Sequence, residues 1–301
     1  MNISLRGDGF EEILACPICG SRDLKPFPEA EYHLNLVKPL GILRCKRCGL
    51  NFMSPRPDHL LRDQIFSGHL PSQLQAYGKT IAYGEITNLR SVQFQSRLNK
   101  IANVMGERNK DKKTNFLDIG SANGLLVHLA QENGWKSYGL EASVSEVTKI
   151  ADPPIKSRIT VGMAEALPFP ANTFSVIHAH HVWEHLLDPL QATKCVYDSL
   201  ESGGIFYCEV PNQFDNIMFR RDMLLHRVPQ RERNMFSIHH NYFYSQDTFR
   251  LLFKEAGFSK IFVGHKYEWP IKGWRSLFTI FTRLIGAFHY GGSLIYAYMI
   301  K

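Results

Sequence analysis

Apolar residues recur along the second half of the chain with two spacings that alternate from one segment to the next. Unbroken or alternating apolar runs are typical of strands, and apolar residues three or four positions apart are typical of helices. Strands are expected at residues 115–119, 137–141, 158–161, 174–180, 205–210, 260–267 and 294–300. Helices are expected at residues 125–133, 143–150, 190–200 and 246–256. The alternation predicts an α/β fold with a largely parallel, doubly wound sheet.

The remainder of the chain is organised around this pattern. Helical spacing runs through residues 63–105, and a charged, solvated link follows. We expect three units: a cysteine-bearing unit at 1–60, a helical linker or cap at 61–113, and the α/β domain at 114–301. Two segments interrupt the alternation and are expected to be insertions, at 212–238 and 270–291.

Four of the six cysteines form two C-x-x-C pairs, each followed by a glycine. The pairs are Cys16 with Cys19 and Cys45 with Cys48. Each pair places two thiolates on a tight turn, and the glycine lets the backbone curl around the sulfur atoms. Four thiolates complete the tetrahedral shell of a zinc ion and leave no open position for catalysis. We therefore expect a structural zinc ribbon, in which the metal supplies folding energy.

Composition restricts the possible classes of protein and partner only slightly. The formal net charge is +7 and the hydrophobic fraction is 44%, so a globular chain with an anionic partner is expected. That partner is a nucleotide, a phosphorylated metabolite, a nucleic acid or a membrane surface. The N-terminus lacks the apolar segment of a secretory signal, and no apolar run reaches the roughly 18 residues of a membrane span. A cytoplasmic location is expected, where cysteine pairs bind metal rather than form disulfides.

A glycine turn follows the strand expected at 115–119 and leads into a helix. Gly120 permits the tight turn, Gly124 permits close approach at the helix start, and Asp118 lies at the strand end. Glu141 ends the next strand, where an acid suits the two ribose hydroxyls of a nucleotide cofactor. A nicotinamide-binding unit competes on spacing alone, but the turn is D-x-G-x-x-x-G and not G-x-G-x-x-G.

Several motifs in order resemble those of class I S-adenosylmethionine-dependent methyltransferases. They are the turn at 116–124, the G-L-E-A-S segment at 139–143, the segments at 164–170 and 172–174, the E-H-L-L-D-P turn at 184–189 and the L-E-S-G-G segment at 200–204. The resemblance covers roughly residues 115–270 and implies a seven-stranded, Rossmann-like methyltransferase sheet. It implies a cofactor site formed by Asp118, Gly120, Ser121, Gly124, Glu141, Ala142, Met163, Ala164, Glu165 and His180.

Two positions depart from that family's pattern. Ala122 stands where the family usually has glycine, which we treat as a small change. Met163 stands where the family often has an acid that binds the adenine amino group. The adenine contact is then expected from the backbone of Met163 and Ala164, or from Glu165.

Two histidine-rich stretches follow the fourth and fifth expected strands of the sheet, where the acceptor must approach the methyl group. The segment 237–258 resembles a block in zinc-binding sugar C-methyltransferases, and the resemblance aligns His240 with their catalytic base. His239 and Ser237 depart from that block, which leaves O- and C-methylation both open. His185 belongs to the E-H-L turn and either takes part in catalysis or packs the helix start.

A divalent metal is a further hypothesis for the same region. His181, Glu184 and His185 have i, i+3, i+4 spacing, and His240 can approach from the next loop. Small-RNA 2′-O-methyltransferases have a similar set, with an acid where this chain has His181. The candidate catalytic residues are therefore His240, His185 and His181.

The two insertions suggest contacts with a substrate or a partner. The first contains Arg220, Arg221, Arg227, Arg231 and Arg233. These arginines either form a solvated face or grip a phosphate, as in a nucleotide-linked sugar. Residues 271–290 form an apolar stripe that suits core packing, a dimer contact or membrane-surface docking.

The resulting expectation is S-adenosylmethionine-dependent methyl transfer, on oxygen or carbon, to a small sugar-containing or phosphorylated metabolite. An RNA methyltransferase that uses its zinc ribbon to bind RNA is the alternative enzyme. Against it, the fourth strand ends in H-A-H-H and not in the Asn/Asp-Pro-Pro-aromatic turn of base-amino methyltransferases. A non-catalytic cofactor-binding scaffold is the third hypothesis.

Overall fold

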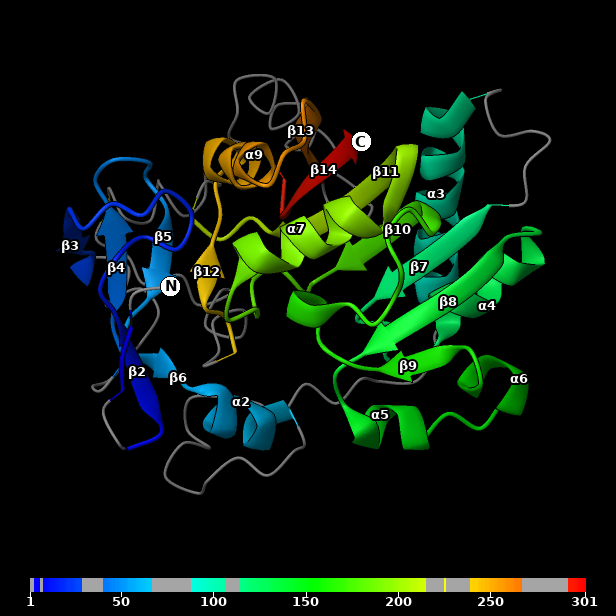
Figure 1. Cartoon of the computed structure of the whole chain (residues 1–301), viewed down its shortest axis with the longest axis horizontal. Coiled ribbons are helices and arrows are strands. Elements are labelled where there is room, and N and C mark those ends of the chain that lie inside the picture. Colours follow the sequence, from blue (N-terminus) through cyan, green and yellow to red (C-terminus); the bar gives the residue numbers. More distant parts are fainter. Residues whose placement is uncertain are drawn as a thin grey trace.

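A computed structural model describes residues 3–5, 8–28, 40–66, 88–106, 114–214, 225, 239–266 and 292–301. Within these ranges the strands form three sheets, of three, four and seven strands (Figure 1). The insertion expected at 270–291 and nearly all of that expected at 212–238, including its five arginines, lie outside the described residues. No helix of the described part is both long enough and apolar enough to cross a membrane.

The largest sheet confirms the expected doubly wound architecture. Its strands are β7 (Asn115–Ile119), β8 (Lys136–Glu141), β9 (Ile159–Val161), β10 (Phe174–His180), β11 (Leu200–Pro211), β13 (Lys260–Lys266) and β14 (Leu294–Ile300). They lie in the order β13-β14-β11-β10-β7-β8-β9. Strand β14 is antiparallel to both of its neighbours, and the other pairings are parallel. The parallel strands therefore all end at one edge, where the expected cofactor and catalytic residues follow them.

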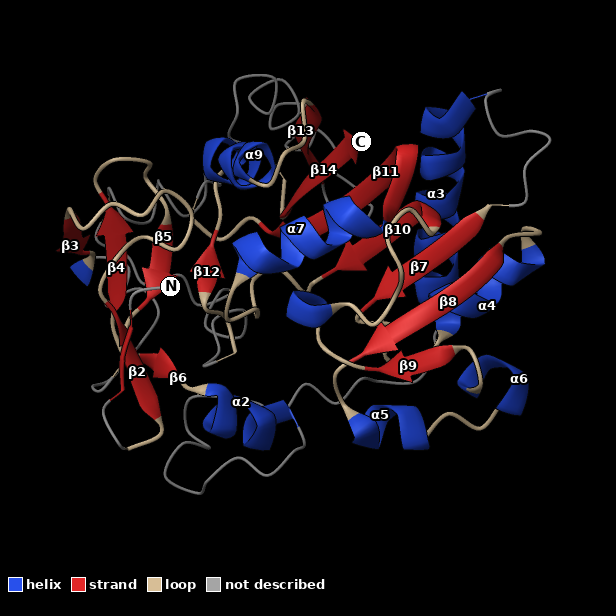
Figure 2. Ribbon diagram, in the orientation of Figure 1, coloured by secondary structure: helices blue, strands red, loops and turns tan. Residues whose placement is uncertain are grey.

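Helices cover both faces of this sheet (Figure 2). Helices α3 (Asn88–Met105) and α4 (Leu125–Glu132) lie on one face, and α7 (Pro189–Ser199) and α9 (Gln246–Glu255) lie on the other. Helices α5 (Val144–Thr148) and α6 (Pro153–Lys156) lie beside β9. Successive strand residues alternate between the faces: Val176 and Tyr207 pack beneath α3, and Ile177 and Phe206 join the core beneath α7 and α9.

The cysteine pairs belong to the N-terminal part of the chain, which forms two small sheets. One contains β1 (Ile3–Leu5), β2 (Phe10–Ile13) and β6 (Arg56–Pro57), after which α2 (His59–Phe66) begins. The other contains β3 (Leu24–Pro26), β4 (Ile42–Cys45), β5 (Asn51–Met53) and β12 (Tyr242–Phe243). Strand β12 comes from the far end of the chain, yet it pairs antiparallel with β5, with Tyr242 opposite Phe52. The ribbon is therefore joined by backbone hydrogen bonding to the segment that leads into α9 (Figure 1).

A buried ion pair reinforces this junction. The Arg56 guanidinium donates to Glu11 at 2.7 Å and to the Tyr242 hydroxyl at 2.6 Å. Tyr242 in turn donates to the Leu187 carbonyl at 2.9 Å, in the turn that follows β10. Arg56 is 1% exposed and Glu11 is 4% exposed, so neither charge has water to replace its partner.

Removing one member of this pair is expected to destabilise the protein strongly. Arg56→Met leaves the Glu11 carboxylate buried and unpaired, which costs about 3–5 kcal/mol of unfolding free energy. Lys46→Met is the matched control, because the Lys46–Asp23 pair of the same ribbon is half-exposed and contributes at most about 1 kcal/mol. Denaturant unfolding of both variants measures the difference. Equal small losses would show that the buried pair does not hold the junction together.

Candidate active site

The glycine turn after β7 has the tight geometry that its sequence predicts. Gly120 and Gly124 have positive φ angles of 75° and 77°, in the left-handed region that favours glycine. A side chain at Gly120 would meet Val182 Cγ2 at 2.4 Å. The turn that follows β10 therefore lies directly on the glycine turn, so the cofactor and catalytic candidates share one edge of the sheet.

Glu141 closes the glycine turn from the neighbouring strand. Its carboxylate accepts from the Ala122 amide at 2.8 Å and from the Ser143 amide at 2.9 Å. Burial raises the pKa of Glu141, and the two amides partly offset that shift. Each carboxylate oxygen keeps a second lone pair, so the group can still accept from two ribose hydroxyls.

Ala122 is a larger departure than the sequence suggests. Its φ angle is 45°, so an alanine holds a left-handed conformation that costs a residue with a Cβ roughly 1–2 kcal/mol. The neighbouring Ser121 is buried, and its hydroxyl lies beneath the turn against Gly139, where an added Cβ would come within 2.6 Å of it. Ser121 thus supports the turn from below, and its amide bonds to the Leu140 carbonyl.

Two other expected cofactor residues point beneath α3. The Asp118 carboxylate accepts from His178 Nδ1 at 2.7 Å, and the His178 ring stacks on Tyr207. His180 lies 3.1 Å from an Arg97 nitrogen and 3.2 Å from the Glu209 carboxylate. Burial, reinforced by His181 and Arg97, lowers the pKa of His180 well below its usual value.

Glu209 is the centre of that second group. It is fully buried and bonds to Arg97, Tyr207 and Lys266. Burial acts to raise the pKa of Glu209, but Arg97 and His180 lower it well below its usual value. Sequence reasoning missed this network, because Arg97 lies on a helix far from Glu209 in the chain and only the register of β11 brings them together.

The segment expected to meet the adenine begins with Met163 and a short 3-10 turn, Ala164–Ala166. Glu165 Oε1 accepts from the Leu187 amide at 3.0 Å and lies 3.7 Å from Arg62. Glu165 is therefore engaged with the turn that follows β10. Met163 is half-buried and Ala142 is exposed, which leaves both accessible to a ligand.

The histidine-rich stretches meet around one buried carboxylate. Glu184 is 1% exposed and accepts from His181 Nδ1 at 2.9 Å, while His185 Nε2 lies 3.8 Å away. The His240 ring packs edge-to-face on the His185 ring, with centroids 4.9 Å apart. We call Glu184, His185 and His240 the Glu/His cluster; one possible ligand atom from each lies within 4.8 Å of the others.

The cluster is held by its own backbone and by residues that the sequence did not single out. Asn241 and Tyr242 amides both donate to the Glu184 carbonyl, at 2.7 and 3.1 Å. The Asn241 side chain donates to the His185 carbonyl, and the Gln213 side chain bonds to His240 Nδ1 at 2.8 Å. The position of Gln213 directly after β11 was the available signal for its role.

Burial controls the charges in this region. Burial and the nearby His185 lower the pKa of His240 to about 3, so its imidazole is neutral near pH 7. Burial acts to raise the pKa of Glu184, but His185 and His181 lower it to about 2. The cluster therefore offers a buried carboxylate beside a neutral imidazole. His181 lies just outside it, with a strained φ of 54°.

The four ribbon cysteines also come together. Cys16 and Cys48 sulfur atoms are 3.5 Å apart, and Cys19 and Cys45 sulfur atoms are 3.6 Å apart. All four lie within 4.8 Å of one another. Four sulfur atoms at 2.3 Å from a tetrahedral zinc would be separated by about 3.8 Å, so the arrangement fits this ion. Four cysteine ligands leave no coordination position for water, which suits a structural role.

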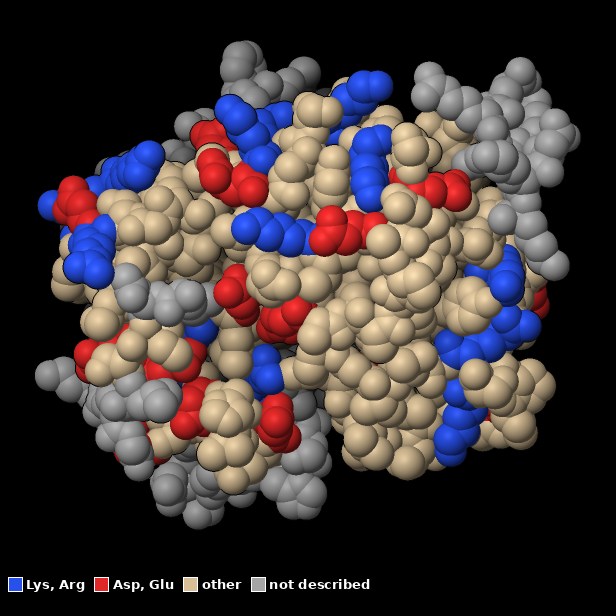
Figure 3. All heavy atoms as spheres, viewed as in Figure 1, with Lys and Arg blue, Asp and Glu red and all other residues tan. Residues whose placement is uncertain are grey.

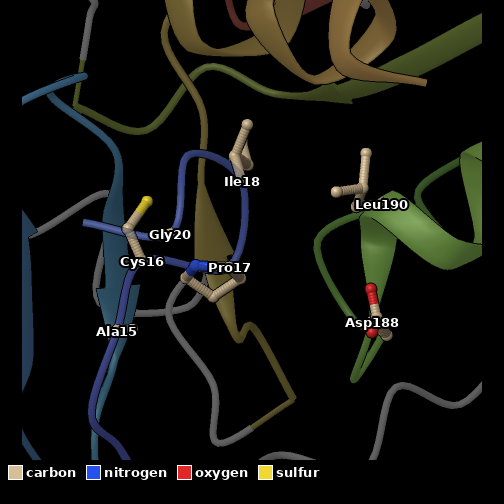
Figure 4. Close-up of a pocket in the computed structure, with 7 residues that line it drawn as sticks. All are labelled: Ala15, Cys16, Pro17, Ile18, Gly20, Asp188 and Leu190. Atoms are coloured by element: carbon tan, nitrogen blue, oxygen red, sulfur yellow. The ribbon is translucent and has the colours of Figure 1, made fainter. Parts of the chain in front are cut away.

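A pocket lies between the first cysteine turn and the start of α7 (Figure 4). It is lined by Ala15, Cys16, Pro17, Ile18, Gly20, Asp188 and Leu190. Asp188 already caps α7 by accepting from the Gln191 amide at 2.9 Å. The pocket shares no residue with the glycine turn or the Glu/His cluster, so it is separate from the candidate active site.

Comparison with known proteins identifies the large sheet's family. Residues 90–261, more than half of the chain, match the family model described as "Methyltransferase domain". No curated protein sequence matches the chain.

Solved structures with a similar fold include a SAM-dependent methyltransferase from Archaeoglobus fulgidus. It is 13% identical, with a TM-score of 0.49, and the match covers 71% of this chain and 95% of that one. Another is phosphoethanolamine N-methyltransferase 2 from Haemonchus contortus in complex with S-adenosyl-L-methionine. It is 16% identical, with a TM-score of 0.47 and coverage of 83% and 62%.

We predict that purified protein contains about one ribbon zinc per chain. The Cys16→Ser, Cys45→Ser variant removes one sulfur from each pair, so it should lose that zinc and unfold at a lower temperature. Cys195→Ser is the matched control, because Cys195 lies on α7 outside the group. Elemental analysis and thermal unfolding measure both effects. Unchanged metal content and stability in the double variant would contradict the ribbon assignment.

We predict that Glu141 binds the cofactor ribose. Glu141→Ala should weaken S-adenosylhomocysteine binding by about 2 kcal/mol or more, because charge-assisted hydrogen bonds are lost. Glu146→Ala is a matched control on the adjacent helix, where Glu146 pairs with exposed Lys149. Titration calorimetry gives both affinities, and an unchanged affinity in Glu141→Ala would remove this residue from the site.

Proposed function

Because the chain belongs to the methyltransferase-domain family and is an S-adenosylmethionine-dependent methyltransferase, we propose that its acceptor is a small, sugar-containing or phosphorylated metabolite. The methyl group goes to oxygen or carbon of that acceptor. The observation that carries this proposal is the position of the Glu/His cluster. Val182 packs on Gly120, so the cluster lies beside the turn that would hold the cofactor.

Burial of the cluster supports a small acceptor. His240 is 7% exposed and Glu184 is 1% exposed, so a compact acceptor group reaches them more readily than a bulky one. The ribbon also has a structural role within the chain, because its strand β5 pairs with β12. On the face shown in Figure 3, acidic and basic side chains are mixed in the upper and left parts, and basic side chains gather along the right-hand edge. The burial of the cluster and the pairing of β5 with β12 favour a metabolite over RNA.

The proposal of a phosphorylated acceptor depends on a group of arginines in the sequence. In the sequence, the five arginines of the 212–238 segment lie between Gln213 and His240. These two residues bond to each other in the site. Arginine binds phosphate oxygens in bidentate fashion. The proposed phosphate contact rests on this charge in the sequence and on the described ends of the segment, Gln213 and His240, which both lie at the site.

Methyl transfer requires few catalytic groups from the protein. The acceptor atom forms a bond to the methyl carbon while the carbon–sulfur bond breaks, and the sulfur keeps the electron pair as S-adenosylhomocysteine forms. A hydroxyl acceptor also loses its proton. We assign that proton to the His240 imidazole, which is neutral near pH 7 and bonds to Gln213, although burial makes it a weaker base than an exposed histidine.

We predict that His240→Ala lowers kcat about 10²-fold or more and leaves S-adenosylhomocysteine affinity nearly unchanged. His239→Ala is the matched control, because it keeps the backbone carbonyl that accepts from His185 Nδ1. The acceptor is first found by following labelled methyl transfer to a panel of nucleotide-linked sugars, sugar phosphates and RNA. Labelling of RNA alone would contradict the proposed acceptor class, and full activity in His240→Ala would exclude this residue as the base.

A further inference from the structure

The Glu/His cluster has the composition and spacing of a metal site distinct from the four cysteines. The distance from His185 Nε2 to Glu184 Oε1 is 3.8 Å, which is too long for a hydrogen bond. Two ligands about 2.1 Å from one tetrahedral cation are separated by about 3.4 Å. The three donors, within 4.8 Å of one another, therefore need only a small contraction to share an ion.

The carboxylate at the centre has an unused oxygen. Glu184 Oε2 is buried and has no hydrogen-bond partner among the residues that the structure describes. A buried carboxylate oxygen without a donor is costly, and a cation at this position would remove the cost. His181 bonds to the other oxygen and so fixes the orientation of the carboxylate.

The His185 imidazole is oriented as metal ligands usually are. A ligating histidine commonly donates its outer N–H to a carbonyl or carboxylate, which leaves the other nitrogen for the metal. His185 Nδ1 donates to the His239 carbonyl at 2.7 Å, and its Nε2 faces Glu184. His240 Nδ1 accepts from the Gln213 side-chain nitrogen at 2.8 Å, so binding of a metal through His240 Nε2 requires the Gln213 amide to turn its oxygen toward the ring.

We propose that Glu184, His185 and His240 bind one divalent transition-metal cation, with zinc as the best match to two imidazoles and a carboxylate. Three protein ligands leave at least one position open. This inference rests on the proposed function in one respect, because the open position would take the acceptor's oxygen. A coordinated hydroxyl loses its proton to water more readily, so the base role assigned to His240 above applies only to the protein without this ion.

The three ligands come from two segments that are hydrogen-bonded to each other. Glu184 and His185 belong to the turn after β10, and His240 precedes β12. The Glu184 carbonyl accepts from both Asn241 and Tyr242 amides, so the two segments cannot separate without breaking backbone hydrogen bonds. The site is thus largely organised before an ion binds, as a selective metal site requires.

The test is a zinc titration of the full chain that already carries its ribbon zinc, followed by calorimetry and elemental analysis. Wild-type protein should bind one additional ion per chain. Glu184→Gln and His240→Asn each remove one ligand and should weaken that binding at least 10-fold. His239→Asn is the matched control and should bind as wild type does, because it keeps the carbonyl that orients His185.

S-adenosylhomocysteine affinity, measured on the same samples, separates this inference from the proposed function. A variant that keeps cofactor affinity is folded, and if either ligand variant fails to fold, the other decides the result. No additional ion in wild-type protein, or equal zinc affinity in a folded ligand variant, would overturn the metal site even if the cofactor binds. Failure of wild-type protein to bind the cofactor would instead overturn the proposed function.

Discussion

The structure depends on the short segment 240–244, which is hydrogen-bonded on both sides. On one side the Asn241 and Tyr242 amides donate to the Glu184 carbonyl of the turn after β10. On the other side the Met53 amide donates to the Asn241 carbonyl, and Tyr242 pairs with Phe52 of the ribbon. One stretch of backbone therefore fixes the ribbon, the large sheet and His240 relative to one another.

This arrangement gives the ribbon a role in the active site. Cys16 and Cys19 lie in the turn that precedes β3. Cys45 ends β4, and Cys48 lies in the turn between β4 and β5. A zinc ion bound by the four cysteines would stabilise the sheet that β12 joins. Strand β12 begins two residues after His240. The Arg56–Glu11–Tyr242 group strengthens the same junction, because the Tyr242 hydroxyl continues to the Leu187 carbonyl. A small domain outside the methyltransferase sheet thus helps to place a candidate catalytic residue.

Local patterns in the sequence were enough to predict the sheet and the thiolate group. Strands at 115–119, 174–180 and 294–300 match the structure at both ends, because apolar residues predominate in each of them. Strand β12 was missed because two residues carry no periodicity, and its pairing with β5 is a tertiary contact. The left-handed conformation of Ala122 and the engagement of Asp118 by His178 also depend on neighbours that are distant in sequence. The position of each candidate cofactor side chain therefore could not be read from its motif alone.

The central claim is that segment 240–244 places His240 against the cofactor's reacting end. The most direct test is a crystal structure with S-adenosylhomocysteine bound. The account predicts that the His240 imidazole faces the cofactor sulfur across the acceptor recess at about 8 Å or less, a span that accommodates the methyl group, the acceptor atom and one hydrogen bond. An imidazole farther away and directed out of the recess would contradict it.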